Sequence, residues 1–388
     1  MFTVQTLDKI SVKGLELFPR DTYEMAADPP APDAILVRSR HMHDMVLPVS
    51  VKAVARAGAG VNNIPIDACS RRGIVVFNTP GANANSVKEL VIAGLLLSSR
   101  WIVQGVEWAK SLAGNGAEVP KLVEQGKKQF AGPEITGKTL GVIGLGAIGV
   151  AVANDASALG MEVVGYDPFL TVDSAWGLSR SVRRAAGLEA LFARSDYITI
   201  HAPLNDTTHG LINADTCRLM KDGVRILNFA RGELVDNDAL FQAFEEEKIA
   251  AYVTDFPNEA LIQHEKVIAV PHLGASTPEA EDNCAVMAIR QLRDFLEHGN
   301  ITNSVNFPNC RLAQPPDDYR IVIANKNEPN MIGQITTVLA RRGINIADMI
   351  NKGRGDLAYT IIDVDTRVSD EVVEQVRTID GVITARAL

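Results

Sequence analysis

The chain has 388 residues, more than one hydrophobic core usually fills, so we expect two or three domains. Its formal net charge of -9 gives no electrostatic footprint for nucleic acid or an anionic membrane surface, and its longest strongly apolar stretch, Leu90 to Leu97, is too short to span a bilayer. Four cysteines without a C-x-x-C pair, and an N-terminus without the apolar segment of a signal peptide, lead us to expect a reduced, cytoplasmic protein without a metal site.

Short apolar runs separated by polar or helical stretches open the chain and predict a first, smaller α/β unit. The strands that we expect there are residues 34–37, 53–57 and 74–77. In open α/β sheets, ligands bind beyond the carboxyl ends of the strands. The residues that follow these strands are therefore candidates for ligand contacts.

Two arginines stand at such strand ends. Arg38, with Ser39 beside it, follows the first strand, and Arg56 lies at the end of the second, before the loop Gly58-Ala59-Gly60. Loop amides can hold a carboxylate, and two arginines can hold a phosphate. The alternative, arginines that are merely exposed on the surface, is equally open from these residues alone.

A Gly-x-Gly-x-x-Gly turn follows the expected strand Thr139 to Ile143 and opens into a helix that ends near Gly160. In such turns the first glycine makes the tight bend, the second lets the backbone approach a pyrophosphate, and the third lets the helix pack on the strand. These positions are Gly144, Gly146 and Gly149, with Ala147 and Ile148 between the last two. The context of strand, turn and helix predicts a dinucleotide site.

A second strand, Glu162 to Tyr166, completes the βαβ unit and is followed by Asp167. A carboxylate at this distance from the glycines can accept hydrogen bonds from the adenosine ribose. Pro168 and Phe169 come next, where an NADP site would carry a cation. We therefore expect NAD as the cofactor.

Further apolar runs alternate with helical segments and predict a doubly wound parallel sheet, since parallel strands buried on both faces read as continuous apolar stretches. The expected strands are 197–200, 224–229, 251–254 and 267–270. An arginine, an acid and a histidine follow the last three strands in turn: Arg231, Glu259 and His272.

These three types of side chain suit the oxidation of a 2-hydroxy acid by hydride transfer. His272 would take the hydroxyl proton and Arg231 would clamp the carboxylate, whereas Glu259 beside the imidazole would favour its protonated form. Each residue alone is more often structural than catalytic. Their placement on successive strand ends beside the glycine turn favours the catalytic interpretation.

Residues 309–318 are polar and contain Pro315 and Pro316, which indicates a linker. The segment after it, from Tyr319, has the pattern strand, helix, strand, strand, helix, strand. This is the βαββαβ order of ferredoxin-like domains.

Taken together, RAGAGVNNI, FNTPGANANSVKELV, GKTLGVIGLGAIG, HAPLNDTT, LNFARGELVD and PHLGASTPEA resemble the D-isomer specific 2-hydroxyacid dehydrogenases that carry a C-terminal ACT domain. The resemblance covers nearly the whole chain and places the family's catalytic positions on Arg231, Glu259 and His272. It also implies further residues at the cofactor and in the substrate pocket. These are Ala202, Pro203, Phe229, Ala230, Asp255 and Gly274 for NAD, and Arg38, Ser39, Arg56, Gly58, Ala59, Gly60 and Asn83 for the substrate.

The fold implied is a Rossmann-type doubly wound parallel sheet inserted in a flavodoxin-like substrate domain, followed by a ferredoxin-like ACT domain. The expected boundaries are 1–82 and 275–308 for the two parts of the substrate domain, 83–274 for the NAD-binding domain, 309–318 for the linker and 319–388 for the ACT-like domain. A homodimer or homotetramer is also implied, with a dimer built through the nucleotide domains.

The sequence departs from the family pattern at several points. Asp255 stands one position nearer Glu259 than usual, Ala260 replaces a proline, and a loop that we expect over Ala113 to Phe130 is longer than common. In the ACT-like region, Asn325, Asn327 and Asn345 match positions that bind serine in regulated relatives, although Asn325 replaces a frequent histidine. L-serine as an effector and an ACT domain used only for assembly are both open.

Within the family, the resemblance is greatest to members that oxidise D-3-phosphoglycerate to 3-phosphohydroxypyruvate, the entry step of serine synthesis. We therefore expect a phosphorylated 2-hydroxy acid as substrate. Two alternatives remain: a hydroxypyruvate, glyoxylate or 2-oxoglutarate reductase of the same family, and a non-catalytic NAD-sensing binding protein that keeps the fold.

Overall fold

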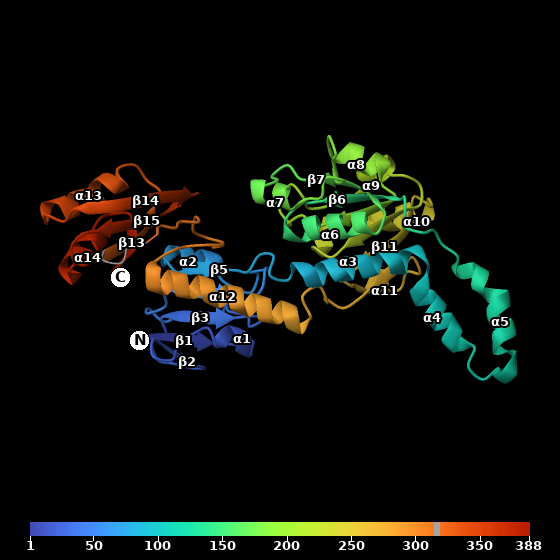
Figure 1. Cartoon of the computed structure of the whole chain (residues 1–388), viewed down its shortest axis with the longest axis horizontal. Helices are drawn as coiled ribbons and strands as arrows, with labels where there is room; N and C mark the ends of the chain where they lie inside the picture. Colours follow the sequence, from blue (N-terminus) through green and yellow to red (C-terminus); the bar gives the residue numbers. More distant parts are fainter. Residues whose placement is uncertain (314–318) are drawn as a thin grey trace. The chain divides into compact units, whose positions relative to one another are not determined.

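The computed structural model describes residues 1–313 and 319–388 (Figure 1). Residues 314–318, the second half of the expected linker, lie outside the described residues. The chain divides into two compact units. Unit 1 consists of Met1–Asn83 and Glu281–Leu388, and unit 2 is the intervening segment Ala84–Ala280.

Unit 1 begins with a five-stranded parallel sheet whose order is β2-β1-β3-β4-β5. This is the flavodoxin-like order. The strands are β1 (Phe2–Thr6), β2 (Tyr23–Ala26), β3 (Ala34–Val37), β4 (Ala53–Arg56) and β5 (Val75–Phe77), with α1 (Val12–Leu15) and α2 (Ile66–Arg71) between them. The three expected strands are confirmed, whereas β1 and β2 were not expected.

The long helix α12 (Pro278–His298) supplies much of the core beneath this sheet. One side of it carries small and medium apolar residues at helical spacing, among them Ala288, Leu292 and Leu296, and these are fully buried. They share one hydrophobic cluster with Leu36 of β3 and Phe77 of β5. The segment after unit 2 therefore folds with the N-terminal segment of the chain.

The C-terminal part of unit 1 is a four-stranded antiparallel sheet in the order β14-β15-β13-β16 with two helices. Its elements are β13 (Tyr319–Lys326), α13 (Met331–Arg341), β14 (Ile346–Arg354), β15 (Leu357–Val364), α14 (Asp370–Arg377) and β16 (Val382–Ala387). The predicted βαββαβ arrangement is confirmed. Strands β14 and β15 pair as an antiparallel hairpin.

Charged side chains of this C-terminal sheet bind the end of α12. Arg320 forms a fully buried ion pair with Asp363 and also donates to the carbonyl oxygen of His298 at 2.8 Å. Arg386 donates to the carbonyl oxygen of Phe295 and lies over its ring, 4.5 Å from the centroid. The last carbonyl groups of a helix have no partner within the helix and carry partial negative charge, so these cations satisfy them.

Unit 2 contains a seven-stranded parallel sheet in the order β12-β11-β10-β9-β6-β7-β8. The strand order reverses between β6 and β9, as it does at the dinucleotide crevice of Rossmann folds. The strands are β6 (Thr139–Ile143), β7 (Glu162–Tyr166), β8 (Arg183–Arg184), β9 (Tyr197–Ile200), β10 (Val224–Asn228), β11 (Ile249–Thr254) and β12 (Val267–Ala269). All but the two-residue β8 were expected, and the doubly wound parallel sheet is confirmed.

Helices lie on both faces of this sheet (Figure 1). They are α3 (Ala84–Ser99), α6 (Ala147–Ala158), α7 (Val172–Gly177), α8 (Leu188–Arg194), α9 (Ala214–Leu219), α10 (Asn237–Glu245) and α11 (Glu259–Ile262), with the short 3-10 turn η3 (Gly232–Leu234).

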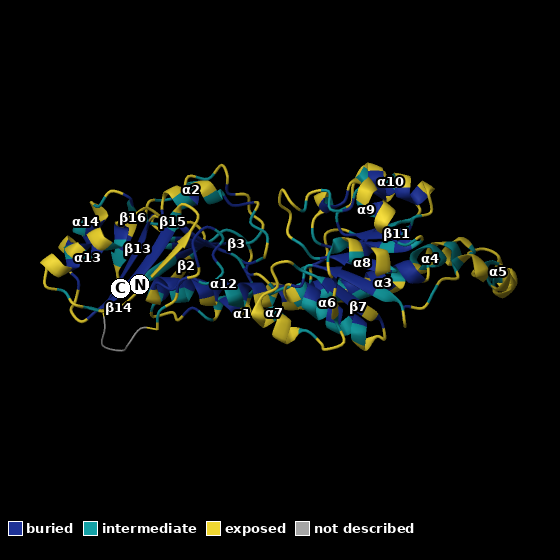
Figure 2. Ribbon diagram, turned by 90° about the horizontal axis from the view of Figure 1, so that it is seen from above, coloured by how far each residue is buried: buried dark blue, intermediate teal, exposed yellow. Residues whose placement is uncertain are grey.

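The segment expected as a long loop, Ala113 to Phe130, is largely helical, so that expectation is wrong. Together with the preceding helix it forms α4 (Ile102–Ser111), η1 (Gly116–Glu118), α5 (Val119–Gly126) and η2 (Lys127–Phe130). No residue of α4 or α5 is fully buried, and both helices are coloured mainly as exposed or intermediate in Figure 2. The ring of Trp108 in α4 packs against the ring of Phe130 at the end of η2, with the centroids 5.3 Å apart.

No single helix of the described residues is both long and apolar enough to cross a bilayer. The pair α3 and α4 passes the test of length and composition only when the two helices are taken together, and they are bent by 62° at the break between them.

Candidate functional site

The three glycines of the turn after β6 differ in what surrounds them. Gly144 has a φ of +89°, and a Cβ there would lie 2.7 Å from the carbonyl group of His201. A Cβ at Gly149 would lie 1.9 Å from the carbonyl oxygen of Gly144. Both positions exclude a side chain. At Gly146, by contrast, no heavy atom lies within 4 Å of the Cβ position.

Gly146 is the N-cap of α6, which starts at Ala147 and Ile148. The open space in front of it therefore lies at a helix N-terminus, where unpaired amides and the helix dipole favour a phosphate group. This open glycine between two crowded ones fits the pyrophosphate of a dinucleotide.

Asp167 directly follows β7 and forms a hydrogen bond with the same glycine turn. Its Oδ2 accepts from the amide of Leu145 and its Oδ1 accepts from the amide of Phe169, both at 2.8 Å. Each carboxylate oxygen can accept more than one hydrogen bond. The half-buried carboxylate can thus hold the glycine turn and still accept from ribose hydroxyls.

The remaining expected cofactor residues follow β9 and β10. Ala202 and Pro203 come directly after His201, whose pKa burial lowers to about 4, so its ring is uncharged at neutral pH. Phe229 and Ala230 lie in the turn that leads to Arg231.

That turn is held by Asn228, a residue that the sequence analysis did not single out. Its fully buried side chain accepts from the amide of Ala230 at 3.1 Å and donates to the carbonyl oxygen of Arg231 at 2.8 Å. A polar residue at the end of a buried strand, directly before the turn that carries a candidate cation, was the signal that could have identified it.

Asp255 is only 1% exposed and follows β11. Its Oδ2 accepts from the amide of Gly274 at 3.1 Å, but its Oδ1 is buried without a hydrogen-bond partner among the described residues. Burial raises its pKa above the ordinary range, although the Gly274 amide and the charges of His272 and Arg231 act in the opposite direction. A buried acceptor without a partner fits a ligand that brings a donor.

Arg231, Glu259 and His272 follow the adjacent strands β10, β11 and β12, as expected, and all three side chains are exposed. His272 lies in the wall of a cavity of about 460 Å³, with its ring 4.8 Å from that of Phe256. Asp255 lines the same cavity, and so do Gly232 and Asn258, the chain neighbours of Arg231 and Glu259.

The expected pairing of Glu259 with His272 is not formed in this structure. Glu259 begins α11, and its Oε1 accepts from the side-chain amide of Gln263, one turn later, at 2.5 Å. An exposed carboxylate on a helix can bond along its own helix, and the spacing of strand ends could not exclude this. The guanidinium of Arg231 donates to the carbonyl oxygen of Ala230 at 2.6 Å.

In unit 1, Arg38 and Ser39 follow β3 and Arg56 ends β4, as expected. The amides of Arg38, Ser39 and Arg40 all donate to Oδ2 of Asp8, at 2.7, 3.0 and 3.1 Å. The backbone after β3 is thus occupied by an internal carboxylate, which the sequence analysis missed. Ligand contacts at Arg38 and Ser39 are left to their side chains.

The structure brings Arg56 next to Arg38, since Arg56 Nε donates to the carbonyl oxygen of Arg38 at 3.0 Å. A Cβ at Gly58 would lie 2.7 Å from the Arg56 guanidinium, so the absent side chain makes room for it. In the same unit, Asn83 has a buried side-chain oxygen without a partner among the described residues.

The Asp8 carboxylate predicts a dependence of stability on pH. Burial raises its pKa and the three amides lower it, and the net result is a pKa below the ordinary value. Asp8 therefore stabilises the fold above the unfolded-state pKa of about 3.9, and this contribution is lost as the pH falls through the folded-state value. We expect Asp8→Asn to reduce the free energy of unfolding at pH 7 by about 1 kcal/mol, with a smaller difference from the unsubstituted protein below about pH 4. Denaturant unfolding at several pH values would test this. Asp28→Asn, at an exposed aspartate, is the control, and an equal difference at pH 7 and pH 3 would contradict the assignment.

Of the three asparagines expected at a regulatory site, two are close together. Asn325 on β13 is buried with an unpartnered Oδ1, and Asn327 two residues later donates to the carbonyl oxygen of Gly355 at 3.0 Å. Asn345 lies at the other end of the sheet, where its carbonyl oxygen accepts from the amide of Asp365. Within one chain the structure does not bring Asn345 to the other two.

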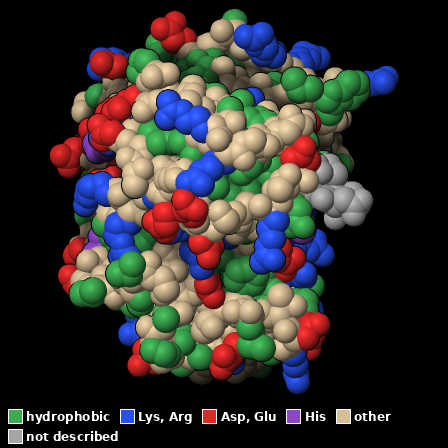
Figure 3. All heavy atoms as spheres, turned by 90° about the vertical axis from the view of Figure 1, so that its left-hand side faces the viewer, with side chains coloured by type: hydrophobic (Ala, Val, Ile, Leu, Met, Phe, Trp, Pro, Cys, Tyr) green, Lys and Arg blue, Asp and Glu red, His purple; other side chains and the backbone are tan. Residues whose placement is uncertain are grey.

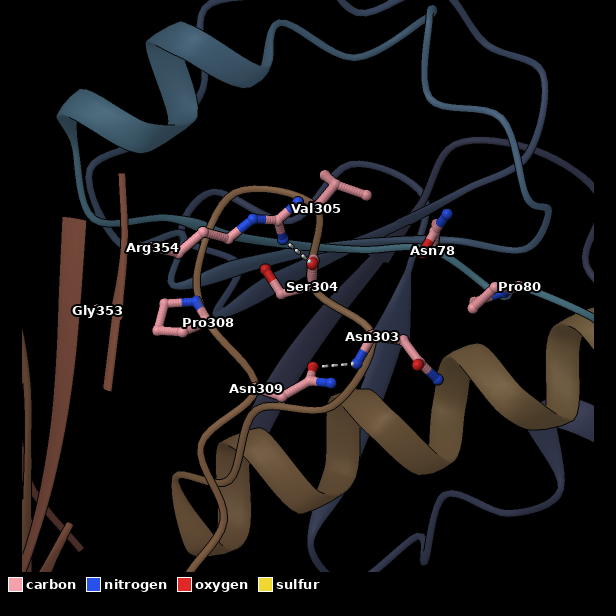
Figure 4. A pocket seen from close by; sticks show the side chains of 9 residues that line it. All are labelled: Asn78, Pro80, Asn303, Ser304, Val305, Pro308, Asn309, Gly353 and Arg354. Carbon is pink, nitrogen blue, oxygen red and sulfur yellow. Dashed lines mark hydrogen bonds between the residues drawn. The ribbon is translucent and has the colours of Figure 1, made fainter. Parts of the chain in front are cut away.

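A second cavity of about 510 Å³ lies within unit 1 between β5, the segment after α12 and the end of β14 (Figure 4). Arg354 reaches across it and donates to the carbonyl oxygen of Ser304 at 2.8 Å. Its wall also includes Asn78, whose side chain donates to the carbonyl oxygen of Ala59 at 2.6 Å. The cavity thus adjoins the loop at Gly58 but contains none of the expected site residues.

Within the described residues, no group of three His, Cys, Asp or Glu side chains is placed to hold a metal ion. On the face shown in Figure 3, acidic and basic side chains are interspersed and form no continuous field of one sign.

Comparison with known proteins places these features in a family context. Residues 100–274 match the model of the D-isomer specific 2-hydroxyacid dehydrogenase, NAD binding domain. A D-3-phosphoglycerate dehydrogenase from Archaeoglobus fulgidus is 33% identical over 350 residues, which cover 86% of this chain and 62% of that protein. The rat D-3-phosphoglycerate dehydrogenase is 38% identical over 262 residues, 66% of this chain and 46% of that protein. The chain thus spans between about half and three fifths of the length of these relatives.

Among solved structures, the NAD+-bound 3-phosphoglycerate dehydrogenase of Entamoeba histolytica superimposes with a TM-score of 0.62 at 27% identity, covering 79% of this chain and 98% of that one. The open glycine turn, its hydrogen bond with Asp167 and the Rossmann strand order coincide with the segment that the family model matches. Residues 100–274 are therefore an NAD-binding domain of the D-isomer specific 2-hydroxyacid dehydrogenase type.

Proposed function

We propose that the protein oxidises D-3-phosphoglycerate to 3-phosphohydroxypyruvate with NAD, the first step of L-serine biosynthesis. The observation that carries the proposal is the placement of Arg231, Asp255 and His272 at the ends of three adjacent strands, on the same sheet as the NAD turn. The similarity to proteins named D-3-phosphoglycerate dehydrogenase supports the choice of substrate.

In this proposal His272 accepts the proton of the substrate hydroxyl and returns one in the reverse direction. NAD, when bound, accepts the hydride from the same carbon. Arg231 has several donors in a planar fork and would bind the substrate carboxylate through two of them. The buried carboxylate of Asp255 would accept a donor of the cofactor with its unpartnered Oδ1.

Glu259 would act as the partner of His272, although its carboxylate accepts from Gln263 in this structure. His272 lines the cavity, and Glu259 directly follows Asn258, which lines it too. Rotation of the Glu259 side chain away from Gln263 would let the carboxylate stabilise the imidazolium that forms during the reaction.

The substrate residues in unit 1 are proposed to select a phosphate. Arg38 and Arg56 supply two guanidinium groups from neighbouring strand ends, and phosphate accepts such forks bidentately. The amides of Ala59 and Gly60 have no hydrogen-bond acceptor in residues 1–313 or 319–388, and these amides, with the unpartnered oxygen of Asn83, would serve the rest of the substrate.

We further propose that residues 319–388 are an ACT domain and that the substrate domain comprises 1–82 and 275–308 around an NAD domain of 83–274. A homodimer or homotetramer in the cytoplasm is the proposed state, with contacts through unit 2, where Ile102 and Val106 of α4 are 42% and 47% exposed. Inhibition of NADH formation by added L-serine would support L-serine as an effector, and an unchanged rate would favour a domain used only for assembly.

The experiment that tests the reaction is spectrophotometric detection of NADH with D-3-phosphoglycerate, D-glycerate, D-lactate and D-2-hydroxyglutarate as alternative substrates. Turnover that favours D-3-phosphoglycerate is expected. Turnover of the plain acids only would identify a reductase of the same family instead, and no turnover of any acid would favour a binding protein.

A further inference from the structure

The guanidinium of Arg38 is engaged by an acidic side chain of its own unit. Arg38 Nη2 lies 2.8 Å from Oε1 of Glu281, which stands in the first turn of α12. The two side chains are 33% and 44% exposed, so the pair is open to solvent and to small ligands.

The backbone that carries Arg38 is held in place independently of this ion pair. Its amide donates to Asp8 and its carbonyl oxygen accepts from Arg56. Loss of the Glu281 contact would therefore change the direction of the Arg38 side chain and leave the strand end where it is.

A third residue, Cys284, lies close to Glu281 of the Arg38–Glu281 pair in the sequence of α12. The thiol of Cys284, three residues after Glu281 on α12, is buried. Burial raises the pKa of this thiol; the charges of Arg38 and Arg56 act to lower it, and that of Glu281 acts to raise it. Arg38 contacts the Glu281 carboxylate through its guanidinium and Arg56 through its carbonyl oxygen, so that the three charged residues are neighbours.

We infer that Glu281 is a built-in competitor for the phosphate of the substrate: its carboxylate holds Arg38 until a phosphate displaces it. This inference rests on the proposed function, because it concerns the same arginine and the same ligand. A carboxylate and a phosphate use the same donors of a guanidinium, so the two compete for Arg38. Glu281 therefore lowers the affinity of the site for phosphorylated substrate and product alike.

The expected size of the effect on affinity follows from the solvent exposure of the Arg38–Glu281 ion pair. Ion pairs of this kind are worth little because water screens them, which corresponds to about a two- to fivefold change in a dissociation constant. The binding free energy that competition by Glu281 removes is the same for the bound substrate and for the transition state. Removing the competitor should therefore lower KM without raising kcat.

The test compares variants of the full chain by calorimetric titration with inorganic phosphate and with D-3-phosphoglycerate. Glu281→Gln should bind both about two- to fivefold more tightly. The matched control is Glu279→Gln, which removes the same charge from the same turn of α12 but has no ion pair with Arg38. This control should bind both ligands as the unsubstituted protein does.

A double substitution shows whether the effect passes through Arg38. In an Arg38→Ala background, Glu281→Gln should give no gain in affinity, because the competitor has nothing left to occupy. A gain that persists there would overturn the inference in favour of a general charge effect. Equal affinities of Glu281→Gln and the unsubstituted protein, together with weaker binding by Arg38→Ala, would also overturn it but would leave the phosphate site intact. If Arg38→Ala and Glu281→Gln both leave binding unchanged, the phosphate role of Arg38 in the proposed function fails as well.

Discussion

Replacing His272 with Asn is expected to lower kcat by about 10²- to 10⁴-fold, the range typical for removal of a general acid-base group. The imidazole lies in the cavity wall beyond β12 and is exposed, so the substitution creates no void in the core. The affinity for NADH, measured by fluorescence titration, should stay the same, because the pyrophosphate turn belongs to other residues.

His209→Asn is the matched control for this prediction, since His209 is also an exposed histidine of unit 2 but lies outside the cavity. It should keep the full rate. An unchanged rate in His272→Asn would contradict the acid-base role.

Replacing Gly146 with Ala is expected to weaken NADH binding by about tenfold or more while leaving the fold intact. The Cβ would enter the open space in front of α6, where a pyrophosphate must approach the backbone. The backbone conformation at Gly146 suits any residue, so the free energy of unfolding should be unchanged or higher by up to about 1 kcal/mol.

The control for this second prediction is Gly187→Ala. Gly187 is also the N-cap of a helix in unit 2 and also has no atom within 4 Å of its Cβ position, but it lies before α8. It should bind NADH normally. Equal binding by both variants would show that the space at Gly146 is not the pyrophosphate site.

The elements that could be predicted from the sequence are those whose signal is local. The glycine turn, Asp167 and the strands β9 and β15 carry their reason in a few consecutive residues, either apolar runs or positions that exclude a side chain. The C-terminal βαββαβ order was readable for the same reason, because each of its helices has a clear apolar face.

The elements that were missed have a weaker local signal in the sequence. The edge strand β2 is half exposed, and β8 consists of two exposed arginines, so neither has an apolar run. The helices of the segment Ala113 to Phe130 were read as a loop because none of their residues is fully buried.

Side-chain partners in the candidate site were also beyond the sequence. The order of strand ends placed Glu259 and His272 on neighbouring strands but could not show that Glu259 bonds to Gln263. In the same way, Arg38 was identified as a candidate for ligand contacts, but its amide is bound by Asp8 and its guanidinium by Glu281. Both partners come from segments with no sequence motif of their own.

The central claim, oxidation of a phosphorylated 2-hydroxy acid with NAD, is tested most directly by one ratio. This is kcat/KM for D-3-phosphoglycerate divided by kcat/KM for D-glycerate, which differ only by the phosphate, measured as NADH formation. Because two guanidinium groups are proposed to bind the phosphate, each worth about 1.5 to 3 kcal/mol for a charged hydrogen bond, we expect a ratio of at least about 10². A ratio near one, with NADH formed from both acids, would contradict it.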